Sequence, residues 1–239
     1  MVNMKKDVSS LFLVFVSFVF ISLNSCSTSP EKESDKEVYT KEESAQVLAD
    51  KNDSLFKAGK KLYNGGNYKK AVELWFQAAE HGSEDAKYNL AVCYYLGTGV
   101  PQSYEKSIEI FMTLAESGAA DAQYNLAQCY HRGEGVLQSY EEAVKWYRKA
   151  ANQGFAYAQY NLGICYKEGQ GVEQSLEEAA KWWHMAADQD LVDAQYNLGV
   201  CYEEGQGVEQ SFEEALKWYR RAADQGSEEA KAVLESLGY

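Results

Sequence analysis

Cysteine thiols can form disulfides or bind metal ions, and the spacing of the cysteines is the most regular chemical feature of this chain. Four of the five follow one another at intervals of 36 residues: Cys93, Cys129, Cys165 and Cys201. Such spacing predicts one thiol at the same place in each unit of a repeat. If the units are helical, an intervening helix keeps neighbouring thiols at least about 10 Å apart, whereas a disulfide needs Cα atoms within about 7 Å. We therefore expect four free, buried thiols.

A second candidate for chemistry is Ser103-Tyr104-Glu105-Lys106, which resembles the Ser-x-x-Lys motif of penicillin-recognising enzymes. The Lys-Thr-Gly and Ser-Asp-Asn sequences that accompany this motif in those enzymes are absent. A penicillin-binding or β-lactamase-like hydrolase is therefore the alternative, and we expect a protein without enzymatic activity. In the other repeats the serine is followed three residues later by glutamate, which is the pattern of a helix capping box: Ser139/Glu142, Ser175/Glu178 and Ser211/Glu214.

Charge and histidine placement argue against two further classes of partner. The 239-residue chain has a formal net charge of −13, so it offers no basic stripe to neutralise the phosphates of a nucleic acid. His81, His131 and His184 occupy unrelated positions in the repeat, and none has a neighbour at metal-ligand spacing. We expect no cofactor, no metal ion and no nucleic acid.

The 36-residue period also defines the elements that must position these residues. In the unit 158–193, the first ten residues show helical apolar spacing, Gly169 and Gly171 end that helix, and Ser175 begins a second one. One helical hairpin cannot bury its apolar stripe alone, so neighbouring units must stack. The expected solenoid spans residues 41–239, with units 52–85, 86–121, 122–157, 158–193 and 194–229 and a partial repeat 230–239.

The phrase AQYNLG-x-CY-x-x-G-x-GV-x-QS-x-EEA, present over residues 86–229, resembles the Sel1-like repeat, a relative of the tetratricopeptide repeat. The unit 52–85 has tighter, tetratricopeptide-like spacing, with Gly65-Gly66-Asn67-Tyr68 as a short turn. The resemblance implies an all-α, right-handed α-solenoid whose concave surface is made mostly by the first helix of each unit. It also implies a scaffold for protein–protein interaction.

Carried over by position, the resemblance places one aromatic residue and one asparagine of each unit on the concave face. In related repeats an asparagine here often hydrogen-bonds the backbone of a bound peptide, and tyrosine offers a large contact area with little rotamer entropy. Asp85, Asp121 and Asp193 flank this stripe and favour a basic protein or peptide as the partner. The alternative, that these residues brace neighbouring helices, stays open. The candidate peptide-binding residues are Phe56, Tyr88, Asn89, Tyr124, Asn125, Tyr160, Asn161, Tyr196 and Asn197.

The N-terminal residues are typical of an export signal, because a basic flank precedes the apolar run from Leu11 to Leu23. The run ends in Leu23-Asn24-Ser25-Cys26, which resembles a bacterial lipobox. That resemblance implies removal of residues 1–25, acylation of Cys26, and a lipid anchor in the cell envelope. The outer membrane is favoured over the inner one because Ser27, rather than aspartate, follows the cysteine. Plain secretion with an incidental cysteine is the alternative.

Residues 26–40 contain almost nothing to bury and are expected to form a disordered tether. Together these patterns predict a membrane-anchored scaffold that binds an extended peptide or a partner protein in its concave groove. A structural bridge between components of the cell envelope is a further alternative.

Overall fold

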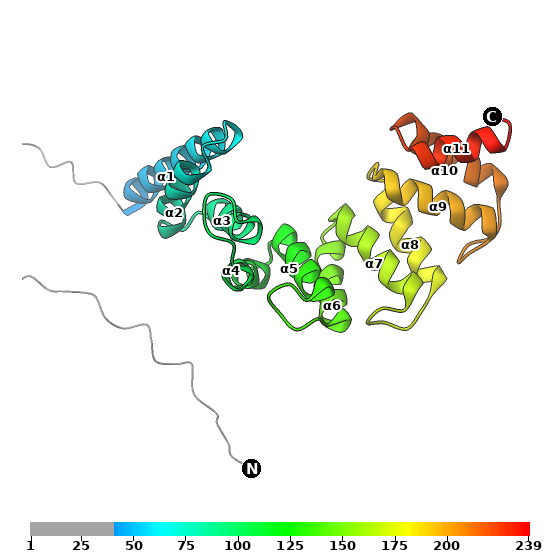
Figure 1. Cartoon of the computed structure of the whole chain (residues 1–239), viewed down its shortest axis with the longest axis horizontal. Helices are drawn as coiled ribbons and strands as arrows, with labels where there is room; N and C mark the ends of the chain where they lie inside the picture. The colour runs from blue at the N-terminus through cyan, green and yellow to red at the C-terminus, as the bar shows by residue number, and fades with distance from the viewer. Residues whose placement is uncertain (1–40) are drawn as a thin grey trace, which may run out of the picture. The chain divides into compact units, whose positions relative to one another are not determined.

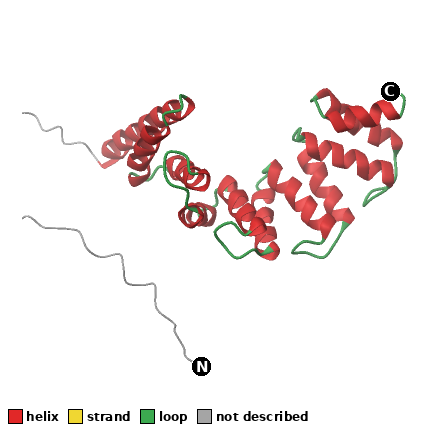
Figure 2. Cartoon of the chain, in the orientation of Figure 1, coloured by secondary structure: helices red, strands yellow, loops and turns green. Residues whose placement is uncertain are grey.

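The computed structural model describes residues 41–239, and every regular element in this part of the chain is an α-helix (Figure 1 and Figure 2). The expected signal peptide, the acylation site Cys26 and the tether lie outside the described residues. The helices are α1 (Lys41–Asn64), α2 (Tyr68–Glu80), α3 (Glu84–Leu96), α4 (Tyr104–Glu116), α5 (Ala120–Arg132), α6 (Tyr140–Asn152), α7 (Ala156–Glu168), α8 (Leu176–Ala187), α9 (Val192–Glu204), α10 (Phe212–Asp224) and α11 (Glu228–Ser236).

Consecutive helices pack against one another in chain order, so five helix pairs are followed by the single helix α11 (Figure 1). Each core layer is shared by three consecutive helices. One layer, for example, joins Ala127 of α5, Tyr147 of α6 and Leu162 of α7, all of them buried. The second helix of a pair thus covers its apolar stripe with the first helices of its own pair and of the next. This arrangement confirms the predicted all-α solenoid.

Within a pair, a small residue of the first helix faces a large ring of the second. A Cβ atom added to Gly163 would lie 2.5 Å from the indole nitrogen of Trp183, and Gly59 approaches Trp75 equally closely. The Trp183 nitrogen donates a hydrogen bond of 3.1 Å to the carbonyl oxygen of Tyr160. The indole therefore fills the layer only because the residue facing it has no side chain.

The two glycines of each long turn have different tasks. Gly169 ends α7 with φ of 67°, a left-handed conformation that costs glycine no strain. Gly171 lies against the start of α6 in the preceding pair, where an added Cβ would be 2.3 Å from the carbonyl of Tyr140. The turn consequently holds two successive pairs together as well as reversing the chain.

Serine caps begin the second helices α4, α6, α8 and α10, but the predicted capping box is only half formed. The serine Oγ accepts a hydrogen bond from the backbone N–H three residues later, at 3.2 Å for Ser175. The predicted return bond, in which the serine N–H donates to the glutamate carboxylate, is wrong. That N–H donates to the carbonyl of Tyr166 at 2.9 Å, and Glu178 accepts a hydrogen bond from Lys181 at 2.7 Å instead. The same two backbone contacts recur at Ser103, Ser139 and Ser211.

The four repeated cysteines are free and buried, which confirms the prediction made from their spacing. Burial raises the pKa of each thiol to about 11, because a thiolate in the core would lose its hydration. They therefore serve as small core residues.

Replacing Ser103 or Ser175 by alanine removes the same cap and leaves the same bond from the cap N–H to a tyrosine carbonyl. We expect each substitution to lower the free energy of unfolding by about 1 kcal/mol, measured by urea denaturation. The threonine variants, which keep a hydroxyl, are the controls. A clearly smaller loss at Ser103, where Lys106 replaces the glutamate, would show that the glutamate does complete a capping box.

In a Cys26→Ala background, we expect the four repeated thiols to react with a disulfide reagent far more slowly in the native chain than in urea. The thiolate is the reactive form, and a pKa near 11 leaves little of it at pH 7.5. Because the unfolded thiols lose their protons first, near their ordinary pKa, the free energy of unfolding should fall as the pH rises through 9 to 11. Reductant should leave the melting temperature unchanged, and a decrease would reveal a disulfide.

Candidate functional site

The predicted tyrosines and asparagines lie half-buried on the first helices α3, α5, α7 and α9. The side-chain amide of an asparagine bonds the tyrosine hydroxyl of the preceding first helix, so each contact joins two successive pairs. We call these contacts the Tyr–Asn rungs. They are Tyr88–Asn125 at 2.9 Å and Tyr124–Asn161 at 3.4 Å.

The tyrosine rings of the rungs also pack on the core. The ring centre of Tyr88 lies 5.8 Å from that of Phe111, and Tyr124 lies 6.0 Å from Tyr147. Burial raises the pKa of the Tyr88 hydroxyl, and the nearby carboxylate of Asp121 raises it further. The hydroxyl therefore stays protonated and the rung stays formed at neutral pH. The rungs hydrogen-bond successive first helices to each other, which is the arrangement that the bracing interpretation of the Tyr and Asn pattern predicts.

The series of rungs stops at both ends. Residue 56 on α1 is phenylalanine, which leaves the amide of Asn89 without the tyrosine partner that its counterparts have. At the other end Tyr196 meets no matching asparagine, because Val233 of α11 occupies that place in the repeat. The unused hydrogen-bonding groups of the pattern are thus concentrated at the two terminal positions.

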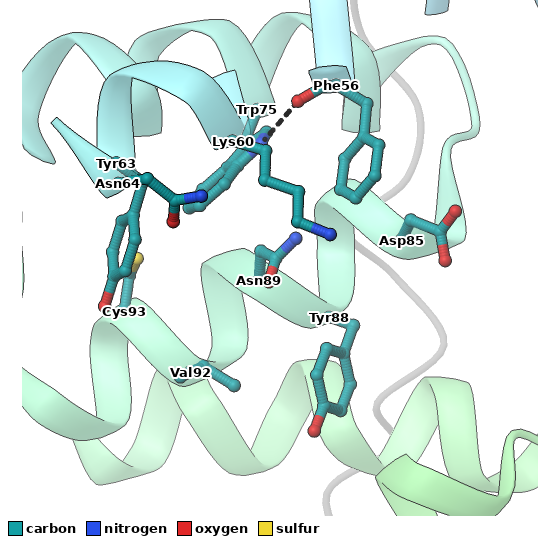
Figure 3. A pocket seen from close by; sticks show the side chains of 10 residues that line it. All are labelled: Phe56, Lys60, Tyr63, Asn64, Trp75, Asp85, Tyr88, Asn89, Val92 and Cys93. Carbon is teal, nitrogen blue, oxygen red and sulfur yellow. Dashed lines mark hydrogen bonds between the residues drawn. The ribbon is translucent and has the colours of Figure 1, made fainter. Parts of the chain in front are cut away.

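A cavity of about 350 Å³ opens where Asn89 lacks its rung, between α1, α2 and α3 (Figure 3). Phe56 and Tyr63 supply aromatic surface, Lys60 extends from α1 into the space, and Asp85 brings a carboxylate to it (Figure 3). The cavity therefore combines apolar faces, a free amide and one charge of each sign. The complete lining is Phe56, Lys60, Tyr63, Asn64, Trp75, Asp85, Tyr88, Asn89, Val92 and Cys93.

Three of the predicted site residues, Phe56, Tyr88 and Asn89, come together in this cavity. The other six continue along α5, α7 and α9 and do not reach it. Sequence reasoning missed Lys60, Tyr63 and Asn64. The available signal was helical spacing, because Lys60 and Asn64 follow Phe56 by four and eight residues and so share its face of α1.

Buried glutamines form a second connection between pairs that sequence reasoning also missed. The amide of Gln159 donates to the carbonyl of Ala151 at 3.1 Å and accepts from Gln189 at 2.8 Å. Equivalent contacts join Gln123 to Gln153 and Gln195 to Gln225. Each buried amide is therefore hydrogen-bonded within the fold, and we assign these glutamines a role in the stability of the array.

The Ser-x-x-Lys sequence does not form a pair of nucleophile and base. Ser103 accepts a hydrogen bond of 3.3 Å from the backbone N–H of Lys106, whose ammonium lies 5.2 Å from the centre of the Tyr94 ring. Within residues 41–239, no three His, Cys, Asp or Glu side chains gather as a metal site requires. In the same part of the chain no helix is long and apolar enough to cross a membrane.

The missing rung at Asn89 provides an internal control for the bracing role. We expect Asn125→Ala to lower the free energy of unfolding by about 1 kcal/mol, because it removes the hydrogen bond to Tyr88. Asn89→Ala, at the same place in the preceding repeat, should change it by less than about 0.5 kcal/mol. If urea denaturation shows that the two variants lose the same free energy of unfolding, the rung does not brace the helices.

The solved structures that resemble this chain include two that are more than 30% identical to it. The Sel1 repeat protein from Oxalobacter formigenes is 31% identical with a TM-score of 0.72, and the match covers 78% of each chain. The protein c5321, a protective antigen of uropathogenic Escherichia coli with an SLR fold, is 33% identical with a TM-score of 0.74. That match covers 81% of this chain and 43% of the Escherichia coli chain, so this chain spans less than half of the larger protein. A search of curated proteins finds no matching sequence.

The family model described as the Sel1 repeat matches five successive stretches, residues 53–83, 84–118, 120–155, 156–191 and 192–227. The first stretch lies within the unit whose shorter turn indicates tetratricopeptide spacing, so the model extends over that unit as well. The five stretches cover most of the chain and correspond to the five helix pairs. The chain belongs to the Sel1 repeat family.

Proposed function

We propose that this chain is a lipid-anchored scaffold of the cell envelope whose cavity between α1 and α3 binds an extended segment of a partner protein. Proteins of the Sel1 repeat family generally act as scaffolds for protein interaction and are typically not enzymes. The observation that carries the finer assignment is the unpaired amide of Asn89 in a cavity with aromatic walls.

A primary amide suits the backbone of an extended peptide, because it donates and accepts hydrogen bonds at once. Phe56 and Tyr63 offer flat apolar faces to the peptide side chains. Lys60 provides a donor for a carbonyl or carboxylate, and Asp85 an acceptor for a basic side chain.

The rest of the stripe extends this cavity along the first helices. A Tyr–Asn rung joins neighbouring first helices directly, so they lie about 10 Å apart, the spacing of packed helices, and an extended chain advances about 3.3 Å per residue. About three ligand residues thus separate one repeat from the next. Asp121, at the start of the next first helix α5, lies along this course and favours lysine or arginine in the ligand.

The anchor in this proposal rests on Leu23-Asn24-Ser25-Cys26. A diacyl or triacyl group on Cys26 would hold the chain stably at a bilayer, as a single acyl chain does not. The outer membrane is the proposed location.

Peptides of 12 residues selected from a phage library on the wild-type chain test the cavity. We expect Asn89→Ala to weaken their binding about 10-fold and to leave the melting temperature unchanged, because the amide takes part in no rung. Asn161→Ala, in the fourth helix pair, is the matched control: it should lower the melting temperature and leave the affinity for the peptides nearly unchanged. Undiminished binding to Asn89→Ala, measured by fluorescence anisotropy, would remove the cavity as the peptide site.

A further inference from the structure

The hairpin of α1 and α2 carries a concentrated positive charge in an otherwise acidic chain. Residues 57–70 contain five lysines and no acidic residue, whereas residues 71–239 contain 27 acidic and 12 basic residues. Residues 41–56 contain four acidic and two basic residues, so the positive charge is a local patch around the turn between α1 and α2. The five lysines, all exposed, are Lys57, Lys60, Lys61, Lys69 and Lys70.

Of the five, only Lys57 forms an ion pair within the described residues, and three of the other four lie beside the turn that joins α1 to α2. Lys61 lies in the last turn of α1, and Lys69 and Lys70 lie in the first turn of α2. None of the three forms an ion pair within residues 41–239. Glu73, one turn further along α2, is exposed and pairs with none of them.

The charge on α2 opposes the stability of the helix that carries it. A helix N-terminus favours acidic residues, yet the first turn of α2 contains none and carries Lys69 and Lys70. Its N-cap, Asn67, makes no side-chain capping bond either. A charge arrangement that folding does not favour indicates a role in contact with something outside the fold.

An aromatic side chain lies between the lysines. Tyr68, the first residue of α2, is 42% exposed, and its ring stands edge-on to that of Tyr63 at 4.9 Å. A tyrosine ring with an apolar body and a polar hydroxyl is suited to the boundary between lipid and water. The surface therefore combines three free ammonium groups with an interfacial aromatic residue.

We propose that this surface, formed by Lys61, Tyr68, Lys69 and Lys70, docks on an anionic phospholipid bilayer. Proximity comes from the lipid anchor proposed above. Lys41 follows Cys26 by 15 residues, and this stretch can span up to about 50 Å, while α1 extends about 30 Å from Lys41 to Lys61. The hairpin can therefore reach the same bilayer.

The expected affinity of this surface for an anionic bilayer follows from its charges. Each lysine close to an anionic bilayer favours the bound state about 5-fold, so three give about 100-fold at low salt. The acidic residues of 71–239 are repelled from the same surface. The bilayer thus orients the array, with α1 and α2 against the lipid and the later pairs away from it.

Amine footprinting of the full-length chain, read by mass spectrometry, tests this orientation. The chain is mixed with vesicles of phosphatidylcholine alone, or with 30% phosphatidylglycerol, in 20 mM salt. We expect Lys61, Lys69 and Lys70 to be modified several-fold more slowly with phosphatidylglycerol than without it, and 0.5 M salt to abolish the difference. Modification of three distant lysines should stay the same: Lys181, Lys217 and Lys231.

Charge-neutral variants complete the test. Phosphatidylglycerol should raise the affinity of the wild-type chain for vesicles. Joint substitution of Lys61, Lys69 and Lys70 by glutamine should lower this gain in affinity about 100-fold, without lowering the melting temperature. Joint substitution of Lys181, Lys217 and Lys231 by glutamine removes the same charge and should change it little. Association with neutral vesicles reads the lipid anchor separately, so failure of the anchor and failure of the docking surface give different results.

Two outcomes would overturn the docking surface. One is that the three lysines are modified at the same rate with neutral and with anionic vesicles, whether or not the chain is bound to the vesicles. The other is protection in the absence of lipid that grows with protein concentration, which would mean that the acidic end of a second copy covers the lysines.

Discussion

The burial of one apolar layer among three consecutive helices is the constraint on which the rest of this structure depends. A helical pair exposes an apolar stripe that only the following pair can cover. The layer closes because small and large residues face each other, as Gly163 and Trp183 do. It also requires the second turn glycine, such as Gly171, to lie directly on the preceding pair. Caps, rungs and buried glutamines then fix the angle and register of pairs already held together by packing.

This repetition explains why the candidate site lies at one end of the array. In the interior, the hydroxyls of Tyr88 and Tyr124 each accept a hydrogen bond from an asparagine of the next pair, so the pattern satisfies its own polar groups there. The first pair departs from the repeat at residue 56, where phenylalanine replaces tyrosine. Asn89 is left available for a ligand, and Lys60 and Tyr63 of α1 complete the walls of the cavity. Specificity in a repeat protein can therefore come from the place where the repeat is broken.

The period, the paired glycines and the serine caps predicted the helices because each is a local property of the chain. The free thiols followed from the spacing of the cysteines and from the width of a helix. The capping box failed at its second bond because the N–H of Ser175 has a tertiary partner, the carbonyl of Tyr166, which no local pattern reveals. The partner of each asparagine was equally hidden, since a contact across 37 residues depends on the angle between pairs. Lys60 shares a helical face with Phe56, yet a prediction based on repeated positions passed over a residue that the other repeats do not share.

The central claim is that a partner binds at the broken end of the repeat and not uniformly along the stripe. Val92, Ile164 and Val200 occupy equivalent places in three repeats, and only Val92 lines the cavity. A photo-reactive amino acid placed at each position in turn, in the full-length chain, would report the contact with a selected peptide directly. Binding at the cavity predicts strong crosslinking from Val92 and weak crosslinking from Ile164 and Val200. Equal crosslinking from all three positions would contradict it.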